Sequence, residues 1–174
     1  MIKLKDILLE NTPPHILVPR GVKGRLDKLI QAYIANGSKG TLDLTDMNMT
    51  KLPDVFKYVN VGGDFYCGYN ELTSLEGAPR VGGDFYCDSN ELTSLIGAPK
   101  SVSGNFACYN NKLTSLEGAP KSVGGGFYCS GNKLTSLEGA PQSVGRDFNC
   151  SNNVVKFTEE QVRAVCNVKG SITV

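Results

Sequence analysis

Five of the six cysteines recur at one position of a repeated stretch of sequence, and such a series of thiols suggests two kinds of chemistry. They are Cys67, Cys87, Cys108, Cys129 and Cys150. Thiols on neighbouring strands lie within range of a disulfide bond or a shared metal ion. Structural zinc sites, however, draw cysteines from short C-x-x-C motifs, which this chain lacks, and cysteine is among the most buried residue types. The sequence therefore predicts that the thiols pack in a core, with no metal site and no cofactor.

Nucleophilic catalysis would have to use the single histidine, His15. A Cys–His or Ser–His pair requires it, but it lies far in sequence from every cysteine, in a segment where a surface or cap histidine is the ordinary role. The pairs Gly62-Gly63 and Gly82-Gly83 look superficially like phosphate-binding loops, yet neither precedes a helix or a Lys-Ser/Thr pair. We therefore predict no catalytic residues and do not expect an enzyme.

Tyrosines and acids gather at the positions where the repeats differ from one another. Residues that alternate with inward-facing Phe and Cys in a strand face outward, which places five of the seven tyrosines on one face. Tyrosine offers a large amphipathic surface at low entropic cost and is enriched at protein interfaces. The predicted partner-binding residues are Tyr66, Tyr69, Tyr86, Tyr109, Tyr128, Asp64, Asp84, Asp88, Glu71 and Glu91.

The charge of this face narrows the class of partner. It carries eight acids against two lysines. The acids are Asp43, Asp46, Asp64, Glu71, Asp84, Asp88, Glu91 and Asp147. Phosphate backbones would be repelled by such a face, so nucleic acid is not an expected partner.

The repeat that positions these residues is 20 to 21 residues long. Its phenylalanines are Phe65, Phe85, Phe106, Phe127 and Phe148, and an asparagine follows each of them five residues later. A fixed period of this length is typical of a solenoid, in which each unit buries its apolar face against its neighbours. Within a unit, Phe and Cys follow strand periodicity, Asn ends the strand by bonding the turn backbone, and Gly-Ala-Pro makes the far turn.

The unit Phe-x-Cys-x-x-Asn-x-Leu-x-x-Leu resembles a leucine-rich repeat, with Phe and Cys in place of its second and third leucines. The resemblance implies an α/β leucine-rich-repeat solenoid with one parallel β-strand per repeat, few or no convex helices, a helical N-terminal cap and a short C-terminal helical cap. One departure is regular: glycine or serine replaces the first leucine and implies a tighter turn before each strand. The sequence is also similar to short-repeat proteins of bacteriophages and bacteria.

The repeat divides the chain into three segments. Residues 1–39 form an N-terminal extension and helical cap, in which 24–37 carries an apolar helical face. Residues 40–157 form a solenoid of about six rungs. Residues 158–174 form a C-terminal cap, whose helix is started by a capping box with a hydrophobic staple at 157–162. The final KGSITV is a candidate closing strand.

Composition sets the remaining expectations. The chain has 174 residues and a net charge of +1, which suits one domain without polyelectrolyte character. No apolar run approaches the roughly 18 residues of a membrane span, and the first residues lack the pattern of a secretory signal. Buried free thiols suit a reducing compartment. We expect a cytoplasmic protein with no membrane partner.

The predicted function is non-enzymatic protein binding across the tyrosine- and acid-rich face. If the chain is viral, the expected partner is a host factor, met in the host cytoplasm. Three alternatives stay open. A glycan could stack on the tyrosines, the chain could self-associate as a structural subunit such as that of a virion, or paired acids such as Asp64 and Asp84 could serve catalysis or hold a cation.

Overall fold

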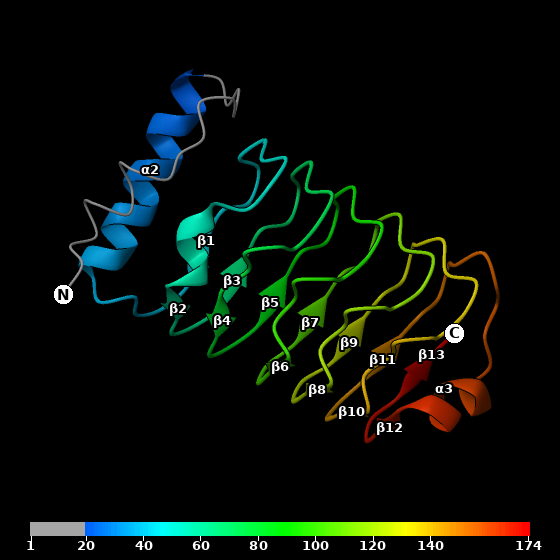
Figure 1. Ribbon diagram of the computed structural model, residues 1–174. Helices are drawn as coiled ribbons and strands as arrows, with labels where there is room; N and C mark the ends of the chain where they lie inside the picture. The colour runs from blue at the N-terminus through cyan, green and yellow to red at the C-terminus, as the bar shows by residue number, and fades with distance from the viewer. Residues whose placement is uncertain (1–19) are drawn as a thin grey trace.

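The chain folds into a parallel β-solenoid. The computed structural model describes residues 20–174. Successive turns stack in register, so that Phe65 lies opposite Phe85 and Phe85 opposite Phe106. The turns form one row between a long helix at the N-terminal end and a short helix at the C-terminal end (Figure 1). Each sequence repeat is therefore one turn of the solenoid.

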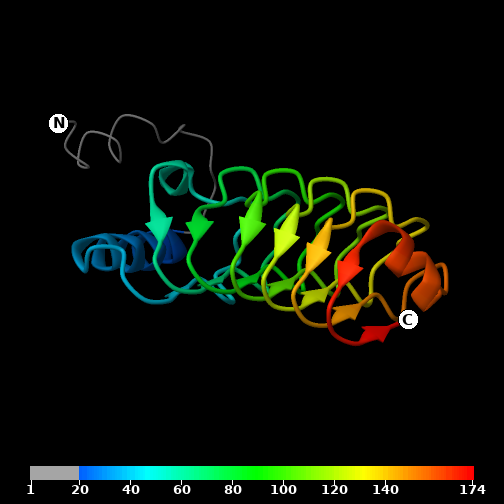
Figure 2. The same ribbon diagram turned by 90° about the horizontal axis from the view of Figure 1, so that it is seen from below.

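A seven-stranded parallel sheet runs the length of the stack, and each turn contributes one strand to it, as predicted. Its strands, in spatial order, are β1 (Leu42–Asp43), β3 (Phe65–Tyr66), β5 (Phe85–Tyr86), β7 (Phe106–Ala107), β9 (Phe127–Tyr128), β11 (Phe148–Asn149) and β13 (Ile172–Thr173). The last strand confirms the closing strand expected from KGSITV. Figure 2 shows β13, in red, as the last strand of this sheet beside the C-terminus.

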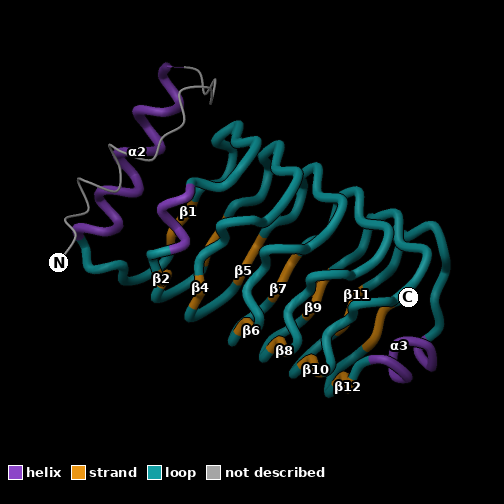
Figure 3. Tube along the Cα trace, viewed as in Figure 1, coloured by secondary structure: helices purple, strands orange, loops and turns teal. Residues whose placement is uncertain are grey.

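A second set of short strands, which the sequence did not predict, lies on the adjoining side of the stack. It comprises β2 (Asn60–Val61), β4 (Arg80–Val81), β6 (Ser101–Val102), β8 (Ser122–Val123), β10 (Ser143–Val144) and β12 (Asn167–Val168). In four of these six strands, β2, β4, β8 and β10, a glycine follows the valine and lets successive turns approach closely at this corner. A Cβ on Gly82 would lie 2.3 Å from the carbonyl oxygen of Gly62. All strands are short, and most of each turn is loop (Figure 3).

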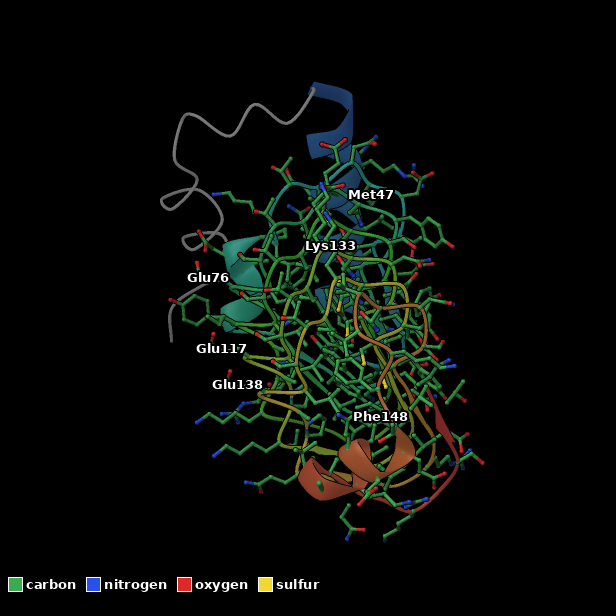
Figure 4. All side chains as sticks on the ribbon, turned by 90° about the vertical axis from the view of Figure 1, so that its right-hand side faces the viewer. Met47, Glu76, Glu117, Lys133, Glu138 and Phe148 are labelled. Carbon is green, nitrogen blue, oxygen red and sulfur yellow. The ribbon has the colours of Figure 1, made fainter. Side chains whose placement is uncertain are left out.

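The interior is a column of phenylalanines flanked by cysteines and leucines. Phe106 and Phe127 stack with ring centroids 5.6 Å apart at 7°, and Phe85 and Phe106 with centroids 5.4 Å apart at 13°. All six cysteines are free and buried, which agrees with their predicted role as core residues. Figure 4, turned by 90° from Figure 1, shows Phe148 within the stack near α3 and Glu76, Glu117 and Glu138 along one side of it.

A ladder of buried asparagine side chains joins each turn to the next. In the middle of the stack, the Asn111 Oδ1 accepts the Leu92 N–H at 3.0 Å. Its Nδ2 donates to the Cys87 and Cys108 carbonyl oxygens, both at 3.1 Å. Asn90 and Asn132 repeat this pattern one turn before and one turn after. Each amide therefore satisfies backbone groups of two turns at once, which confirms the structural role predicted for this column.

Helices lie at both ends of the solenoid. The first, α2 (Arg20–Ala35), adds Leu26, Ile30 and Tyr33 to the hydrophobic core. It begins before residue 24, where the apolar pattern placed it, and the chain leaves it through Gly37 at a φ of 75°. His15 and the rest of 1–19 lie outside the described residues.

Two further helical segments complete the described chain. A 3-10 helix, η1 (Asp54–Lys57), which the sequence did not predict, buries Val55 and Phe56 under the first turns. The C-terminal helix α3 (Glu159–Val165) begins with the predicted capping box, in which Thr158 and Gln161 each bond the other's backbone N–H. Its Val162 is fully buried.

Candidate functional site

The candidate site lies on the outward face of the seven-stranded sheet, at β3, β5 and β7. Tyr66 lies opposite Tyr86, and Tyr86 lies opposite Ala107. The rings of Tyr66 and Tyr86 meet edge to face, with centroids 5.0 Å apart at 68°. Tyr69 and Tyr109 join them from positions just beyond the strands. The sequence pattern therefore placed these tyrosines on the correct face.

Four of the five predicted tyrosines converge on a shallow pocket of about 280 Å³. We call it the tyrosine pocket; its lining residues are Thr45, Tyr66, Gly68, Tyr69, Tyr86, Asp88 and Tyr109. Tyr128 lies outside it, since Ala107 stands between Tyr86 and Tyr128 in the sheet and the Tyr128 hydroxyl lies over Gly126. A Cβ on Gly126 would come within 2.3 Å of the Tyr128 hydroxyl.

Asp88 occupies the floor of the tyrosine pocket. The sequence placed it on the outward face with the other acids, but only 4% of it is exposed. Its carboxylate lies against Gly68, where an added Cβ would be 3.0 Å from Oδ1. The Ser89 hydroxyl donates to Oδ2 at 3.4 Å, and Tyr109 lines the same pocket. A side chain at Gly68 would crowd the Asp88 carboxylate, so the glycine leaves room for it among the tyrosines that line the pocket.

The carboxylates of Asp64 and Asp84 form hydrogen bonds within the site and are not free to bind a ligand. The Asp64 Oδ1 accepts the Asp84 N–H at 2.8 Å, and the Asp84 Oδ1 accepts the Asn105 N–H at 2.7 Å. Their other oxygens accept the phenols of Tyr66 at 3.3 Å and Tyr86 at 3.1 Å. These two acids are thus acceptors in a ladder that fixes the turns and aims the tyrosines.

Three tyrosines of the pocket, Tyr66, Tyr86 and Tyr109, have raised pKa values. Burial and then the charge of Asp64 raise the pKa of Tyr66. Burial also raises the pKa of Tyr86; the Asn105 hydrogen bond lowers it, while Asp84 raises it further. Burial, the charge of Asp88 and the hydrogen bond to Asp88 raise the pKa of Tyr109 to about 12. At neutral pH Tyr66, Tyr86 and Tyr109 therefore offer phenol O–H groups and neutral rings to a ligand.

Tyr69 has the most exposed ring of the pocket and a costly backbone conformation. Its φ is +53°, in the left-handed region, and 60% of the residue is exposed. The corresponding positions of the following turns also have positive φ and are Ser89, Asn110, Gly131 and Asn152. Three of these four are asparagine or glycine, the residues that tolerate this region best, whereas a bulky side chain is an outlier there. Retained strain of this kind is characteristic of functional positions.

The two glutamates of the predicted site do not line the pocket. Glu71 is exposed. Glu91 forms an ion pair with Lys112 on the next turn. Thr45 and Gly68 do line the pocket and were not predicted. One sequence feature could have indicated Gly68: it has no side chain, whereas the same position of the other repeats holds Thr45, Asp88, Tyr109 and two serines.

The cysteine ladder takes no part in the site. Burial raises the pKa of every cysteine, most strongly inside the stack, so the thiols stay protonated and unreactive at neutral pH. No group of three or more His, Cys, Asp or Glu side chains in the described part of the chain is arranged to hold a metal ion.

Comparisons with known proteins add no family. No protein-family model matches the chain, and no curated protein matches its sequence. Among residues 20–174, no helix combines the length and apolar character needed to cross a membrane. The function must therefore be argued from the tyrosine pocket itself.

Proposed function

We propose that this protein is a non-enzymatic binding module that holds another protein on the tyrosine- and acid-rich face of its seven-stranded sheet. The observation that carries the proposal is the convergence of Tyr66, Tyr69, Tyr86 and Tyr109 on one pocket. Tyrosine is enriched among the residues that dominate binding energy at protein interfaces, and such residues cluster near the interface centre.

Pre-organisation of the tyrosines supports the same function. The phenols of Tyr66 and Tyr86 are tied to Asp64 and Asp84, and the Asn105 Nδ2 donates to Asp84 Oδ2 at 3.2 Å. Side chains held in this way lose little conformational entropy when a partner docks. A repeat scaffold presents them on a rigid, extended surface, as solenoid binding proteins do.

The finer features of the proposal come from the resemblance. We propose that the solenoid is of the leucine-rich-repeat type and that the protein is of bacteriophage or bacterial origin, with a host factor as partner if it is viral. We also propose a reducing cytoplasm as its compartment, since six free buried cysteines suit one. The asparagine ladder supports the proposal that the solenoid is of the leucine-rich-repeat type.

Affinity capture with matched variants tests the protein-binding function. A Tyr66→Ala/Tyr86→Ala double variant is expected to bind the captured partner at least 30-fold more weakly than wild type, as loss of two central anchors should. Tyr128→Ala is the control, because it removes a tyrosine of the same face that lies outside the pocket, and it should change binding by less than about threefold.

Retention of the partner by the double variant at wild-type affinity would contradict the proposal. If instead the wild type retains no protein but binds a glycan on an array, and the double variant loses that glycan, the carbohydrate-binding alternative replaces it. Circular dichroism spectra that superimpose on those of wild type confirm that each variant is folded.

A second prediction concerns the strain at Tyr69. Tyr69→Asn is expected to raise the free energy of unfolding by about 1 kcal/mol, because asparagine tolerates the left-handed region. The same change removes an exposed ring from the pocket and should weaken partner binding. Urea denaturation and a binding titration on the same sample measure both effects.

The reciprocal variant Asn110→Tyr is the matched control. It places a tyrosine in the same conformation two turns along, where φ is +54°. It should lower stability by a similar amount and leave binding unchanged. The claim is that Tyr69 keeps a strained backbone because its ring binds the partner. A Tyr69→Asn variant that is less stable than wild type and binds equally well would refute it.

A further inference from the structure

We propose that the tyrosine pocket is a receptor for a cation, and that its occupant is an arginine side chain of the protein partner. This inference rests on the proposed function and names the chemistry by which the partner is recognised. Three features of the pocket carry it: the buried carboxylate of Asp88, the aromatic walls around it and the negative charge of the surrounding face.

The first feature is a buried carboxylate without a counter-charge. Asp88 is 4% exposed and its Oδ2 accepts a hydrogen bond from the Ser89 hydroxyl, a neutral donor. Glu91 and Glu159 form ion pairs with Lys112 and Arg163, whereas no ion pair between described side chains includes Asp88. A buried charge is costly unless it is paired. A cation entering the pocket would supply the pair that the folded chain leaves out.

The second feature is the aromatic wall. Tyr66, Tyr69, Tyr86 and Tyr109 surround the space above Asp88. A cation over the face of an aromatic ring is attracted by the ring quadrupole, and the attraction grows when the site is shielded from water. The raised pKa values of Tyr66, Tyr86 and Tyr109 keep these rings neutral. Rings and carboxylate thus favour the same sign of charge in the ligand.

The third feature is the field around the pocket. Asp43, Asp46 and Glu71 are exposed on the same face, at the turns that contribute Thr45 and Tyr69 to the pocket. Charges of one sign around a cleft raise the local concentration of ligands of the opposite sign. This field speeds the encounter with a basic surface and repels an acidic one.

Among cations, guanidinium fits these groups best. The pocket combines flat ring faces with hydrogen-bond acceptors, namely the Asp88 carboxylate and the phenol and Thr45 oxygens. Guanidinium is planar, stacks on aromatic faces, donates several N–H bonds in a fixed fork and is weakly hydrated. A quaternary ammonium could use the rings but not the acceptors, and an ammonium is more strongly hydrated.

The test is a titration of the full chain with blocked single residues, followed by amide NMR shifts. N-acetyl-arginine methylamide is expected to shift the amide signals of Gly68, Tyr69 and Asp88. The citrulline analogue, which has the same shape without the charge, is expected to shift none of them at equal concentration. The lysine analogue should bind at least threefold more weakly than arginine.

Two isosteric variants make the test specific to the pocket. Asp88→Asn should weaken arginine binding at least tenfold while preserving the volume of the side chain. Asp147→Asn removes the same charge elsewhere on the face, where its Oδ1 accepts the Ser171 N–H at 2.8 Å. This control should change arginine binding by less than about twofold.

The results separate this inference from the proposed function. Equal shifts from arginine and citrulline in the wild-type protein would overturn it without any variant. Lysine binding as tight as arginine would overturn the choice of guanidinium. If the double tyrosine variant loses the captured partner while Asp88→Asn retains it at wild-type affinity, protein binding stands and the cationic occupant is wrong.

Discussion

Replacing Asn111 with alanine is expected to lower the free energy of unfolding by about 3 kcal/mol, a large loss for one polar side chain. The change leaves the buried Leu92 N–H without its acceptor and removes donors from the Cys87, Cys108 and Tyr109 carbonyl oxygens. An orphaned buried backbone N–H costs roughly 1–3 kcal/mol. The carbonyl losses add less, because Asn90 still donates to Cys87 and Asn132 to Cys108.

Urea denaturation monitored by far-UV circular dichroism measures the effect. The matched control is Asn110→Gly, which changes the preceding asparagine, an exposed residue at a φ of +54° that glycine adopts freely. This control should stay within about 0.5 kcal/mol of wild type. If Asn111→Ala were as stable as the control, the ladder would not be holding the turns together.

The second large effect is expected in alkaline solution. The pKa of every cysteine is raised by burial, so the folded chain holds thiol protons that the unfolded chain releases above about pH 8.5. The stability linked to these protons is fully present below that pH and is lost as the pH rises. Above that pH, each such thiol lowers the free energy of unfolding by about 1.4 kcal/mol per pH unit.

Six thiols acting together should unfold the protein between about pH 9.5 and 11, since domains are stable by only about 5–15 kcal/mol. Denaturation at a series of pH values under reducing conditions measures the slope. Cys108→Ala is the matched variant: it should be less stable at pH 7, through lost packing, yet show a shallower pH dependence by about one thiol. Constant stability from pH 7 to 10 would mean that the thiols titrate in the folded chain.

Much of the fold could be predicted because its information is periodic. Phe106, Cys108 and Asn111 each recur at the repeat spacing, and each meets its own copy on the next turn. Strand alternation then decides which of them face inward. The second set of strands, β2 to β12, was missed because its pairing depends on how closely successive turns approach at that corner, which no single repeat reveals.

The candidate site was predictable only in part, because its contacts join different turns and different positions of the repeat. Alternation placed Tyr66 and Tyr86 on the outward face, but it could not distinguish a free acid from a bonded one. The carboxylates of Asp64 and Asp84 accept hydrogen bonds from backbone N–H groups. Asp88, at a later position of the repeat, lies buried among tyrosines. That burial follows from Gly68 on the neighbouring turn, a contact about 20 residues away in sequence.

The asparagine ladder has a consequence for how such a chain can evolve. Because every amide bonds its own turn and the preceding one in the same way, a whole turn such as 124–144 could be deleted or duplicated at the gene level without changing the kinds of contacts inside. The tyrosine pocket has no such freedom: it draws Thr45, Gly68, Asp88 and Tyr109 from four successive turns in fixed order. Homologues of different length are therefore expected to vary by whole turns after residue 109, while the order of the turns before it is kept.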